Sequence, residues 1–142
     1  MTLIVDSGAV YALYDAGDSS HLAVRRVVEE YRGALIVPVA ILAEIDYLLL
    51  EFLGINSELD FLESLQSGAF TLEPFLNEDL ERCREIVAKY RDLKLGLADA
   101  AVMATAERMG TLQVLTVDER HFRAVVSKKG RPFHLLPTDG LQ

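Results

Sequence analysis

The sequence predicts an α/β fold in which helices cover both faces of a largely parallel β-sheet. Five short runs rich in β-branched and aliphatic residues alternate along the chain with longer segments of helical periodicity. Most of the short runs are apolar at successive positions, which is typical of strands that are buried on both faces. A chain of 142 residues has room for one such core, so we expect a single domain over residues 1–142.

The predicted elements have recognisable boundaries. Strands are expected at residues 3–5, 34–37, 70–73, 113–117 and 133–136. Asp18, Ser19 and Ser20 are typical N-cap residues for a helix to about residue 31, and Asn77 for one to about residue 91. Pro38 suits the first turn of the helix after the second strand, and a further helix is expected over residues 95–109. Four glycines are each expected to close a helix, namely Gly33, Gly54, Gly68 and Gly110.

The charge balance excludes a protein that holds nucleic acid through overall positive charge. Fourteen Lys and Arg residues against 22 Asp and Glu residues give a net charge of −8. The charges are unevenly distributed, however. Residues 33–81 contain ten acidic residues and no Lys or Arg, whereas five basic residues lie within twelve positions: Arg120, Arg123, Lys128, Lys129 and Arg131. We therefore expect a local cationic patch near the C-terminus.

Cysteine usage and hydropathy indicate a cytoplasmic protein. The single cysteine, Cys83, has no partner for an internal disulfide, and we expect it to be buried on a helix face with Leu80 and Val87. Asp6 interrupts the first apolar run before a signal-peptide core forms. The uncharged stretch at residues 33–43 is too short to span a membrane.

Several carboxylates stand where a charge is costly to bury. Asp6 and Asp118 each follow a predicted strand directly, and ligands of open parallel sheets bind beyond the carboxyl ends of the strands. Asp99 is the only charged residue in the run 95–106, on a helix that is expected to be buried nearly all round. The helix after Pro38 carries Glu44 and Asp46 on opposite flanks of its apolar face, and periodicity does not choose between them.

If these carboxylates converge at one edge of the sheet, they need a cation, because like charges at close range raise one another's pKa. Hard oxygen ligands select Mg²⁺ or Mn²⁺ over zinc or copper. An all-carboxylate site of this kind is typical of phosphodiester hydrolysis, in which the metal activates water and neutralises developing charge on phosphorus.

At these positions the sequence resembles the PIN-domain ribonucleases, and most closely the VapC toxins of bacterial toxin-antitoxin pairs. Four segments match the acidic motifs of that family in order and together span nearly the whole chain. They are Leu3-Ile4-Val5-Asp6-Ser7-Gly8-Ala9, Leu42-Ala43-Glu44-Ile45-Asp46-Tyr47-Leu48, Leu97-Ala98-Asp99-Ala100-Ala101, and Leu115-Thr116-Val117-Asp118 with Phe122 after it. The match selects Glu44 rather than Asp46.

The resemblance implies a three-layer α/β/α PIN-like fold with a five-stranded parallel sheet. It also implies a Mg²⁺- or Mn²⁺-dependent endoribonuclease, a homodimer and inhibition by a VapB-type antitoxin. The implied metal-binding and catalytic residues are Asp6, Glu44, Asp99 and Asp118. Ser7 stands where the family often has Thr, and Ser7 and Thr116 are expected to support the site. An antitoxin tail is expected to insert an Arg or Lys among the carboxylates.

The basic C-terminal run gains a second interpretation as the contact with the RNA backbone. Arg120, Arg123, Lys128 and Lys129 are expected close to Asp118. We expect His121 to be an isolated surface residue rather than a phosphate contact, and His21 and His134 to be structural or exposed. Core or dimer packing, rather than base stacking, is expected for the aromatic residues near the site, which are Tyr11, Tyr14 and Tyr47.

Two other classes of function are compatible with these residues. One is a PIN-like module that binds RNA or a protein without catalysis, for which the 51% content of hydrophobic residues is the only support. The other is a different α/β phosphoryl-transfer domain, such as a receiver or a phosphatase. Both of those classes usually place a second acid close to the first, whereas Ser7 and Gly8 follow Asp6 here.

Overall fold

A five-stranded parallel sheet with strand order β3-β2-β1-β4-β5 forms the centre of the computed structural model, which describes residues 1–141. All four pairs of neighbouring strands are parallel. The strands are β1 (Thr2–Val5), β2 (Ala34–Pro38), β3 (Thr71–Glu73), β4 (Gln113–Leu115) and β5 (His134–Leu136). The five predicted strands are therefore present, and each differs from its expected bounds by two residues or fewer.

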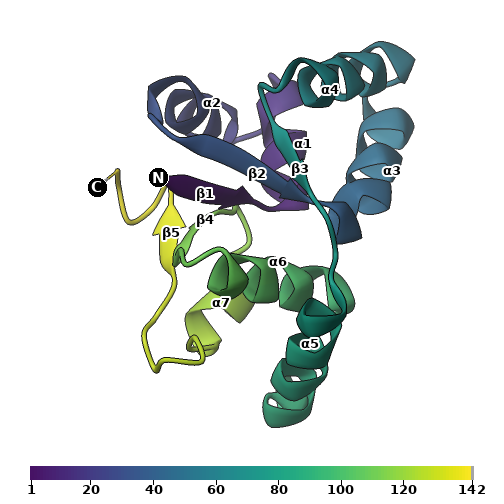
Figure 1. The fold of residues 1–142 in the computed structure, drawn as a ribbon. Helices are drawn as coiled ribbons and strands as arrows, with labels where there is room; N and C mark the ends of the chain where they lie inside the picture. Colours follow the sequence, from purple (N-terminus) through teal and green to yellow (C-terminus); the bar gives the residue numbers. More distant parts are fainter. Residues whose placement is uncertain (142) are drawn as a thin grey trace.

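Helices lie on both sides of this sheet, which confirms the expected three-layer α/β/α architecture. In Figure 1, α1, α2 and α4 lie on one side with α3 near the β3 edge, whereas α5, α6 and α7 lie on the other. The helices are α1 (Ser7–Tyr14), α2 (His21–Glu30), α3 (Leu42–Phe52), α4 (Ile55–Ser67), α5 (Asn77–Lys89), α6 (Leu97–Arg108) and α7 (Arg120–Ala124). Short 3₁₀ turns occupy Val39–Ile41 and Arg91–Leu93. Within residues 1–141, no helix is long and apolar enough to cross a membrane.

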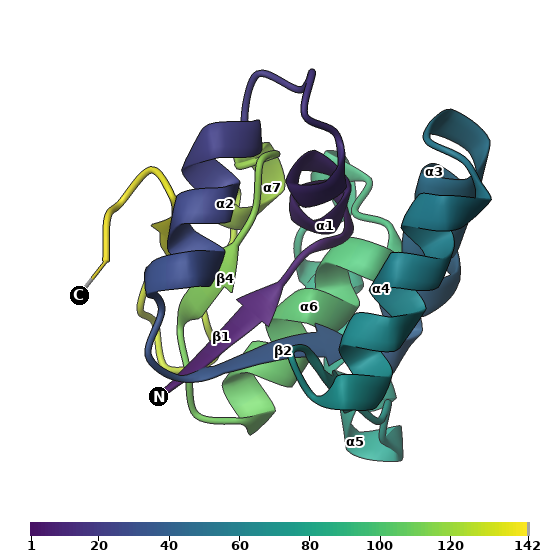
Figure 2. The same cartoon turned by 90° about the horizontal axis from the view of Figure 1, so that it is seen from above.

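The central strands and α6 make up much of the core. Leu3 and Ile4 of β1 are fully buried, and so are Val114 and Leu115 of β4. Helix α6 packs across β1, β2 and β4 and is buried at every position from Ala100 to Ala106. Many of these buried residues are alanines, whose small side chains let a helix backbone lie close to a sheet, and Figure 2 shows α6 running beside β1 and β2. The prediction that Asp99 lies on a largely buried helix is therefore confirmed.

Several predicted helix boundaries are wrong for local reasons. Pro38 ends β2 instead of opening a helix, because a 3₁₀ turn separates it from the start of α3. Asn77 is already helical, since Leu76 is the N-cap and donates its N–H to the Asp79 carboxylate at 3.0 Å. Gly33 lies beyond the end of α2, at a point where a Cβ would stand 2.4 Å from the carbonyl oxygen of Met1. Close approach of two backbones, rather than helix termination, requires glycine there.

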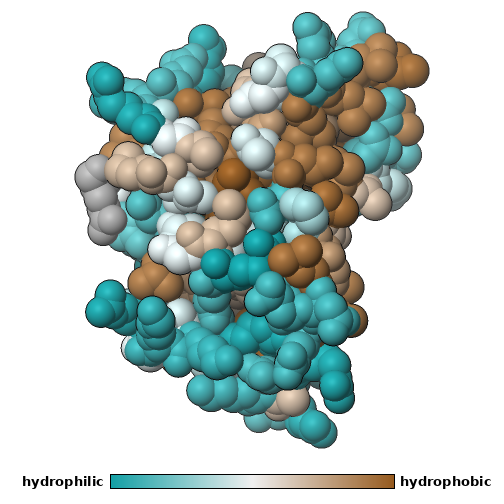
Figure 3. Space-filling view, viewed as in Figure 1, coloured by the Kyte–Doolittle hydropathy of each residue, from teal (hydrophilic) through white to brown (hydrophobic). Residues whose placement is uncertain are grey.

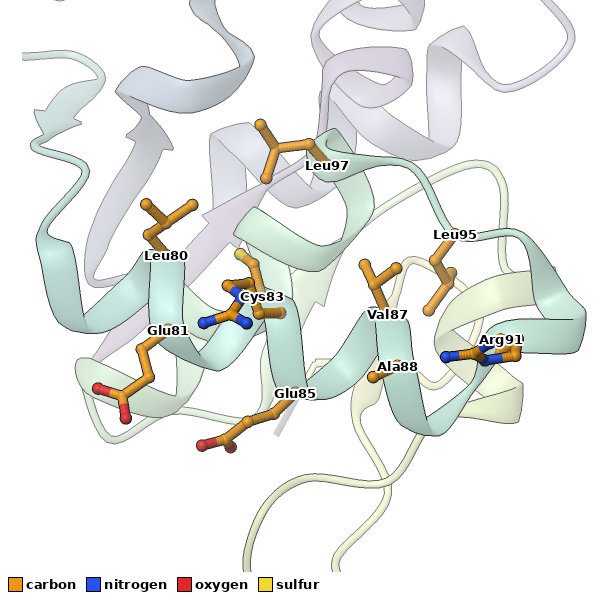
Figure 4. A pocket seen from close by; sticks show the side chains of 10 residues that line it. Leu80, Glu81, Cys83, Glu85, Val87, Ala88, Arg91, Leu95 and Leu97 are labelled. Carbon is orange, nitrogen blue, oxygen red and sulfur yellow. The ribbon is translucent and has the colours of Figure 1, made fainter.

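Cys83 lies on α5 at the floor of a shallow groove on the outer side of the molecule (Figure 4). The cysteine is buried as predicted, and burial raises the pKa of its thiol to about 11, so the thiol is protonated near neutral pH. Leu80 and Val87 line the same groove but are 43% and 38% exposed, whereas we expected them to be buried with the cysteine.

An ion-pair cluster joins β3, α5 and α6 around Arg108, the last residue of α6, whereas Asp99 lies in the first turn of that helix. Arg108 binds Asp79 at 2.8 Å and Glu73 at 2.9 Å, and the Asp79 side chain is only 1% exposed. We expect Arg108→Ala to lower the free energy of unfolding by about 3 kcal/mol, because it leaves a buried carboxylate without a counter-charge. The control is Arg25→Ala, which removes an exposed pair with Glu29 and should cost less than about 1 kcal/mol. Equal effects in urea unfolding would contradict this assignment.

Candidate functional site

The predicted site lies where the strand order changes direction. From β1 the chain adds β2 and β3 on one side and β4 and β5 on the other, so the connections diverge between β1 and β4. In open α/β sheets this switch point leaves a crevice beyond the carboxyl ends of the strands, and ligands bind there. Asp6 follows β1 and Thr116 follows β4, which places both residues at this crevice.

Asp6 is held rigidly in this position. Its backbone N–H donates to the carbonyl oxygen of Leu115 at 2.9 Å, which ties it to the end of β4. Its side chain caps α1, with Oδ1 accepting from the N–H of Ser7 at 2.9 Å. Oδ2 lies 3.0 Å from the hydroxyl of Thr116, which is within hydrogen-bond distance of the Asp118 carbonyl as well. Ser7 and Thr116 therefore support Asp6 directly.

The environment of Asp6 works against its negative charge. Only 5% of the residue is exposed, and the pKa of its carboxyl is raised from 3.8 to about 6, with burial as the largest cause. The carboxylates of Asp99 and Glu44 contribute to this rise in pKa, while the hydrogen bonds from Ser7 and Thr116 oppose it. Asp99 and Glu44 are thus close enough to Asp6 to disfavour its ionised form.

Glu44 rather than Asp46 faces this crevice, in agreement with the motif match. Glu44 lies in the first turn of α3 and accepts a hydrogen bond from the hydroxyl of Ser7. Asp46 lies on another side of α3, where its hydrogen bond with Glu58 of α4 raises the pKa of the Glu58 carboxyl. The periodicity of the sequence did not choose between Glu44 and Asp46 as the site residue. The structure does, because α3 packs against both α1 and α4, with Glu44 next to α1 and Asp46 next to α4.

Asp99 reaches the site from the first turn of α6. Asp6, Glu44 and Asp99 therefore lie at the N-termini of α1, α3 and α6, where the partial positive charge of each helix favours a carboxylate. Asp99 accepts a hydrogen bond from Nδ1 of His121 on α7 at 2.6 Å. The His121 side chain is 15% exposed, so the expectation of an isolated surface histidine is wrong.

Asp118 differs from the other three carboxylates. It is exposed, and its backbone N–H donates to the Thr116 hydroxyl at 3.2 Å. Its carboxylate is absent from the charges that shift the pKa of Asp6. The structure thus places Asp118 at the same strand end as Asp6 without bringing its carboxylate into the cluster of three.

The predicted basic residues do not form one patch beside the carboxylates. Arg120 opens α7, with Nη2 3.4 Å from Nε2 of His121, and so lies at the site. Arg123 is bound by Glu119 and Asp139, both at 2.7 Å, and this ion pair lowers the pKa of the Asp139 carboxyl to about 2. The expected closeness of the two lysines to Asp118 is wrong. The backbone N–H of Lys128 donates to Glu107, which lies about 12 Å along α6 from Asp99, and Lys129 follows it.

Most of the other aromatic and histidine residues considered for the site have structural contacts instead. The Tyr11 hydroxyl donates to Asp15 at 2.7 Å, and Tyr14 packs edge-on against Phe61. Tyr47 is 60% exposed on α3. His21 and His134 contact the backbone carbonyl oxygens of Ala12 and Gly140, both at 2.8 Å. The expected structural role of these two histidines is confirmed.

The donors gathered at the crevice suit a hard divalent cation. Asp6, Glu44 and Asp99 offer only carboxylate oxygens, and a cation between them would relieve the repulsion that raises the pKa of Asp6. Over residues 1–141, no three acidic, His or Cys side chains already converge closely enough to hold a metal ion. Glu44 is hydrogen-bonded to Ser7 and Asp99 to His121 in this arrangement.

Comparison with known proteins identifies the protein family, and it agrees with the fold and with the acidic residues at the switch point. Residues 3–127 match the PIN domain, so the chain belongs to the PIN domain family. Strand β5 lies beyond the matched stretch and pairs with β4, so the same sheet continues past it.

Among individual proteins, the chain is similar to Ribonuclease VapC26 of Mycobacterium tuberculosis. The two are 36% identical over 135 residues, which cover 95% of this chain and 100% of that protein. The fold matches the sarcin-ricin loop cleaving toxin VapC20 of the same organism with a TM-score of 0.78 at 20% identity, over 86% of this chain and 94% of that one. VapBC2 of Rickettsia felis, solved with a promoter DNA fragment, gives a TM-score of 0.67 at 12% identity, over 88% and 93% of the chains.

Proposed function

We propose that the protein is a Mg²⁺- or Mn²⁺-dependent endoribonuclease and the toxin of a VapBC-type toxin-antitoxin module, acting in the cytoplasm. The observation that carries this proposal is the crowding of buried Asp6 by Asp99 and Glu44 at the switch point of the sheet. Neighbouring carboxylates that disfavour the charge of Asp6 favour a divalent cation, and such a site suits phosphodiester hydrolysis. The family and the 36% identity to Ribonuclease VapC26 support the same conclusion.

In this proposal, Asp6, Glu44 and Asp99 hold the cation, and Asp118 contributes through water. A cation held there would supply an activated water and neutralise charge on the phosphoryl oxygens. Ser7 and Thr116 fix both oxygens of Asp6 by hydrogen bonds, so the carboxylate does not rotate as substrate binds. One of the cluster's carboxylates would accept a proton from the attacking water oxygen as that oxygen bonds to phosphorus and the scissile P–O bond breaks, and the leaving oxygen would take up a proton from solvent.

The direct test is cleavage of RNA by the purified protein in the presence and absence of Mg²⁺. We expect internal cuts by the wild type and loss of cleavage in Asp6→Ala and Asp99→Asn. Losing several kcal/mol of transition-state stabilisation corresponds to a rate loss of about 100- to 1,000-fold. Equal activity in all three proteins would show that the carboxylates do not carry the reaction.

The RNA backbone is expected to contact Arg120 at the site and to extend toward Lys128 and Lys129. Arg123 is a weaker candidate because two carboxylates already bind its guanidinium. We expect the double variant Lys128→Ala, Lys129→Ala to weaken RNA binding and to reduce the slope of log affinity against log salt by about 1.4, or about 0.7 per lost phosphate contact. The measurement is fluorescence anisotropy with labelled RNA in EDTA over a range of salt concentrations. An unchanged slope would remove these lysines from the interface.

Exposed apolar residues give the protein a surface for protein partners, for which we propose a second copy of the chain and a VapB-type antitoxin. Figure 3 shows apolar side chains gathered where Figure 1 has α3, α4 and β3. The large hydrophobic residues of α3 and α4 that are at least 43% exposed are Tyr47, Leu50, Phe52, Ile55, Leu59 and Leu62. Surfaces of this kind are typical of interaction sites. Sedimentation tests the homodimer.

For the antitoxin, we propose that a basic side chain of its inhibitory tail binds among Asp6, Glu44 and Asp99 in place of the cation. Co-expression with the product of a small neighbouring reading frame tests this mechanism. Substituting the Arg and Lys residues of its tail should restore RNA cleavage by the complex. Full inhibition by a tail without basic residues would contradict the mechanism.

A further inference from the structure

The contact between His121 and Asp99 is partly buried and is held in place by packing against the core. His121 is the second residue of α7, and its neighbour Phe122 is 1% exposed and packs edge-on against Phe133 with ring centroids 6.3 Å apart. This anchor fixes α7, and with it the direction in which the imidazole leaves the helix. The ring meets Asp99 with Nδ1 2.6 Å from Oδ2, a distance typical of a strong hydrogen bond to a carboxylate.

Arg120 defines which nitrogen of the ring carries the proton. Its Nη2 lies 3.4 Å from Nε2 of His121. A guanidinium only donates hydrogen bonds, so Nε2 faces it as the acceptor and the proton is on Nδ1. Nδ1–H then donates to Asp99, so Arg120, His121 and Asp99 form one directed chain of hydrogen bonds.

We propose that His121 is a positioning residue that orients Asp99 toward the cation. The Nδ1–H group holds Oδ2, and among residues 1–141 no hydrogen bond is made to Oδ1, which is left for the metal. The inference rests on the proposed function. Outer partners that hydrogen-bond a metal-ligating carboxylate fix its orientation, and their loss typically costs about 10- to 100-fold in metal affinity or activity.

The two amide variants of His121 test the geometry. The side-chain nitrogen of Asn reaches the place of Nδ1, whereas that of Gln reaches the place of Nε2. We expect His121→Ala and His121→Gln to weaken Mn²⁺ binding by about 10- to 100-fold in calorimetry, and His121→Asn to retain an affinity within about tenfold of the wild type. An equal loss of Mn²⁺ affinity in the Asn and Gln variants would overturn the proposal. Unchanged Mn²⁺ affinity in all three variants would overturn it as well.

His21→Asn and His21→Ala provide the matched control. His21 also uses Nδ1, but it contacts the carbonyl oxygen of Ala12, away from the carboxylates. These variants should change the melting temperature without changing Mn²⁺ affinity. A loss of metal affinity in them as large as in His121→Ala would show that the His121 effect is a general effect of instability.

A second measurement separates this proposal from the proposed function. Nitrogen NMR of the imidazole in the metal-free protein should show a proton on Nδ1 of His121, directed at Asp99. An Nδ1 without a proton would overturn the hydrogen bond to Asp99, and with it the positioning role, even if the protein cleaves RNA. If the wild type instead fails to bind Mn²⁺ and to cleave RNA, the proposed function fails, and His121 then has no metal ligand to position.

Discussion

Asp6→Asn is expected to abolish RNA cleavage and at the same time to make the metal-free protein more stable near neutral pH. The raised pKa of Asp6 means that its ionised form is less favourable in the folded protein than in the unfolded chain. A rise from 3.8 to about 6 corresponds to about 3 kcal/mol of destabilisation once the group is ionised in both states. A neutral amide removes this cost.

The asparagine fits the hydrogen bonds that surround the position. Its carbonyl oxygen accepts from the N–H of Ser7, as Oδ1 of Asp6 does. Its amide group donates to the oxygen of Thr116, whose own proton then binds the carbonyl of Asp118. We therefore expect the free energy of unfolding to rise by about 1–3 kcal/mol in EDTA at about pH 7.5, measured by urea unfolding.

The pH dependence gives this prediction its sign. Between the unfolded pKa of 3.8 and the folded pKa of about 6, the folded protein binds more protons at Asp6 than the unfolded chain does. The wild type therefore loses stability from this group as the pH rises through that window, and Asp6→Asn does not. The gain from the substitution should be largest above about pH 7 and shrink toward about pH 4. A variant less stable than the wild type at every pH would contradict the assignment.

The second large effect is expected from the metal itself. Mg²⁺ or Mn²⁺ at about 100 times its dissociation constant should raise the free energy of unfolding of the wild type by about 2.7 kcal/mol. Asp6→Asn and Asp99→Asn should gain almost nothing, because each removes a carboxylate of the cluster. In EDTA, Asp6→Asn is expected to be the more stable protein. When metal replaces EDTA, the difference in free energy of unfolding between the two proteins should therefore shrink or change sign.

Thermal unfolding in EDTA and in excess Mn²⁺ measures this effect. Asp46→Asn is the matched control, because Asp46 lies on the same helix as Glu44 but contacts Glu58 instead of the crevice. It should respond to the metal as the wild type does. An equal rise of the melting temperature in all four proteins would indicate binding elsewhere on this acidic surface.

Much of the fold was predictable because the buried strands leave a clear pattern. Each strand core, such as Leu3 to Val5, is apolar on both faces, and a parallel sheet requires this. The ends were harder to predict because tertiary contacts determine them. Val117 continues the apolar run of β4, yet the strand ends at Leu115 because the hydroxyl of Thr116 bonds to Asp6 and to the Asp118 backbone.

The carboxylates of the site were predictable from their positions in the chain, whereas their partners were not. Asp6 and Asp99 stood out as charges among apolar residues, but no pattern paired Asp99 with a residue 22 positions away. One signal was present: Asp99 has no basic residue within one turn of its own helix, so its partner had to come from another element. His121 follows β4, which ends at the same edge of the sheet.

For the basic residues between Arg120 and Arg131, the sequence prediction took nearness in sequence for nearness in space. Lys128 and Arg120 are eight residues apart, but α7 and the bridge between Val126 and Pro132 carry the chain away from the strand end. The Lys128 backbone consequently binds Glu107, at the far end of α6 from Asp99. The local positive charge is thus divided between two places.

Calorimetric titration of Mn²⁺ into the metal-free protein at about pH 7.5 tests the central claim most directly. The carboxylate cluster at the switch point predicts saturable binding by the wild type and by Asp46→Asn, and loss of that binding in Asp6→Asn and Asp99→Asn. Binding that is the same in all four proteins, or absent from the wild type, would contradict the account.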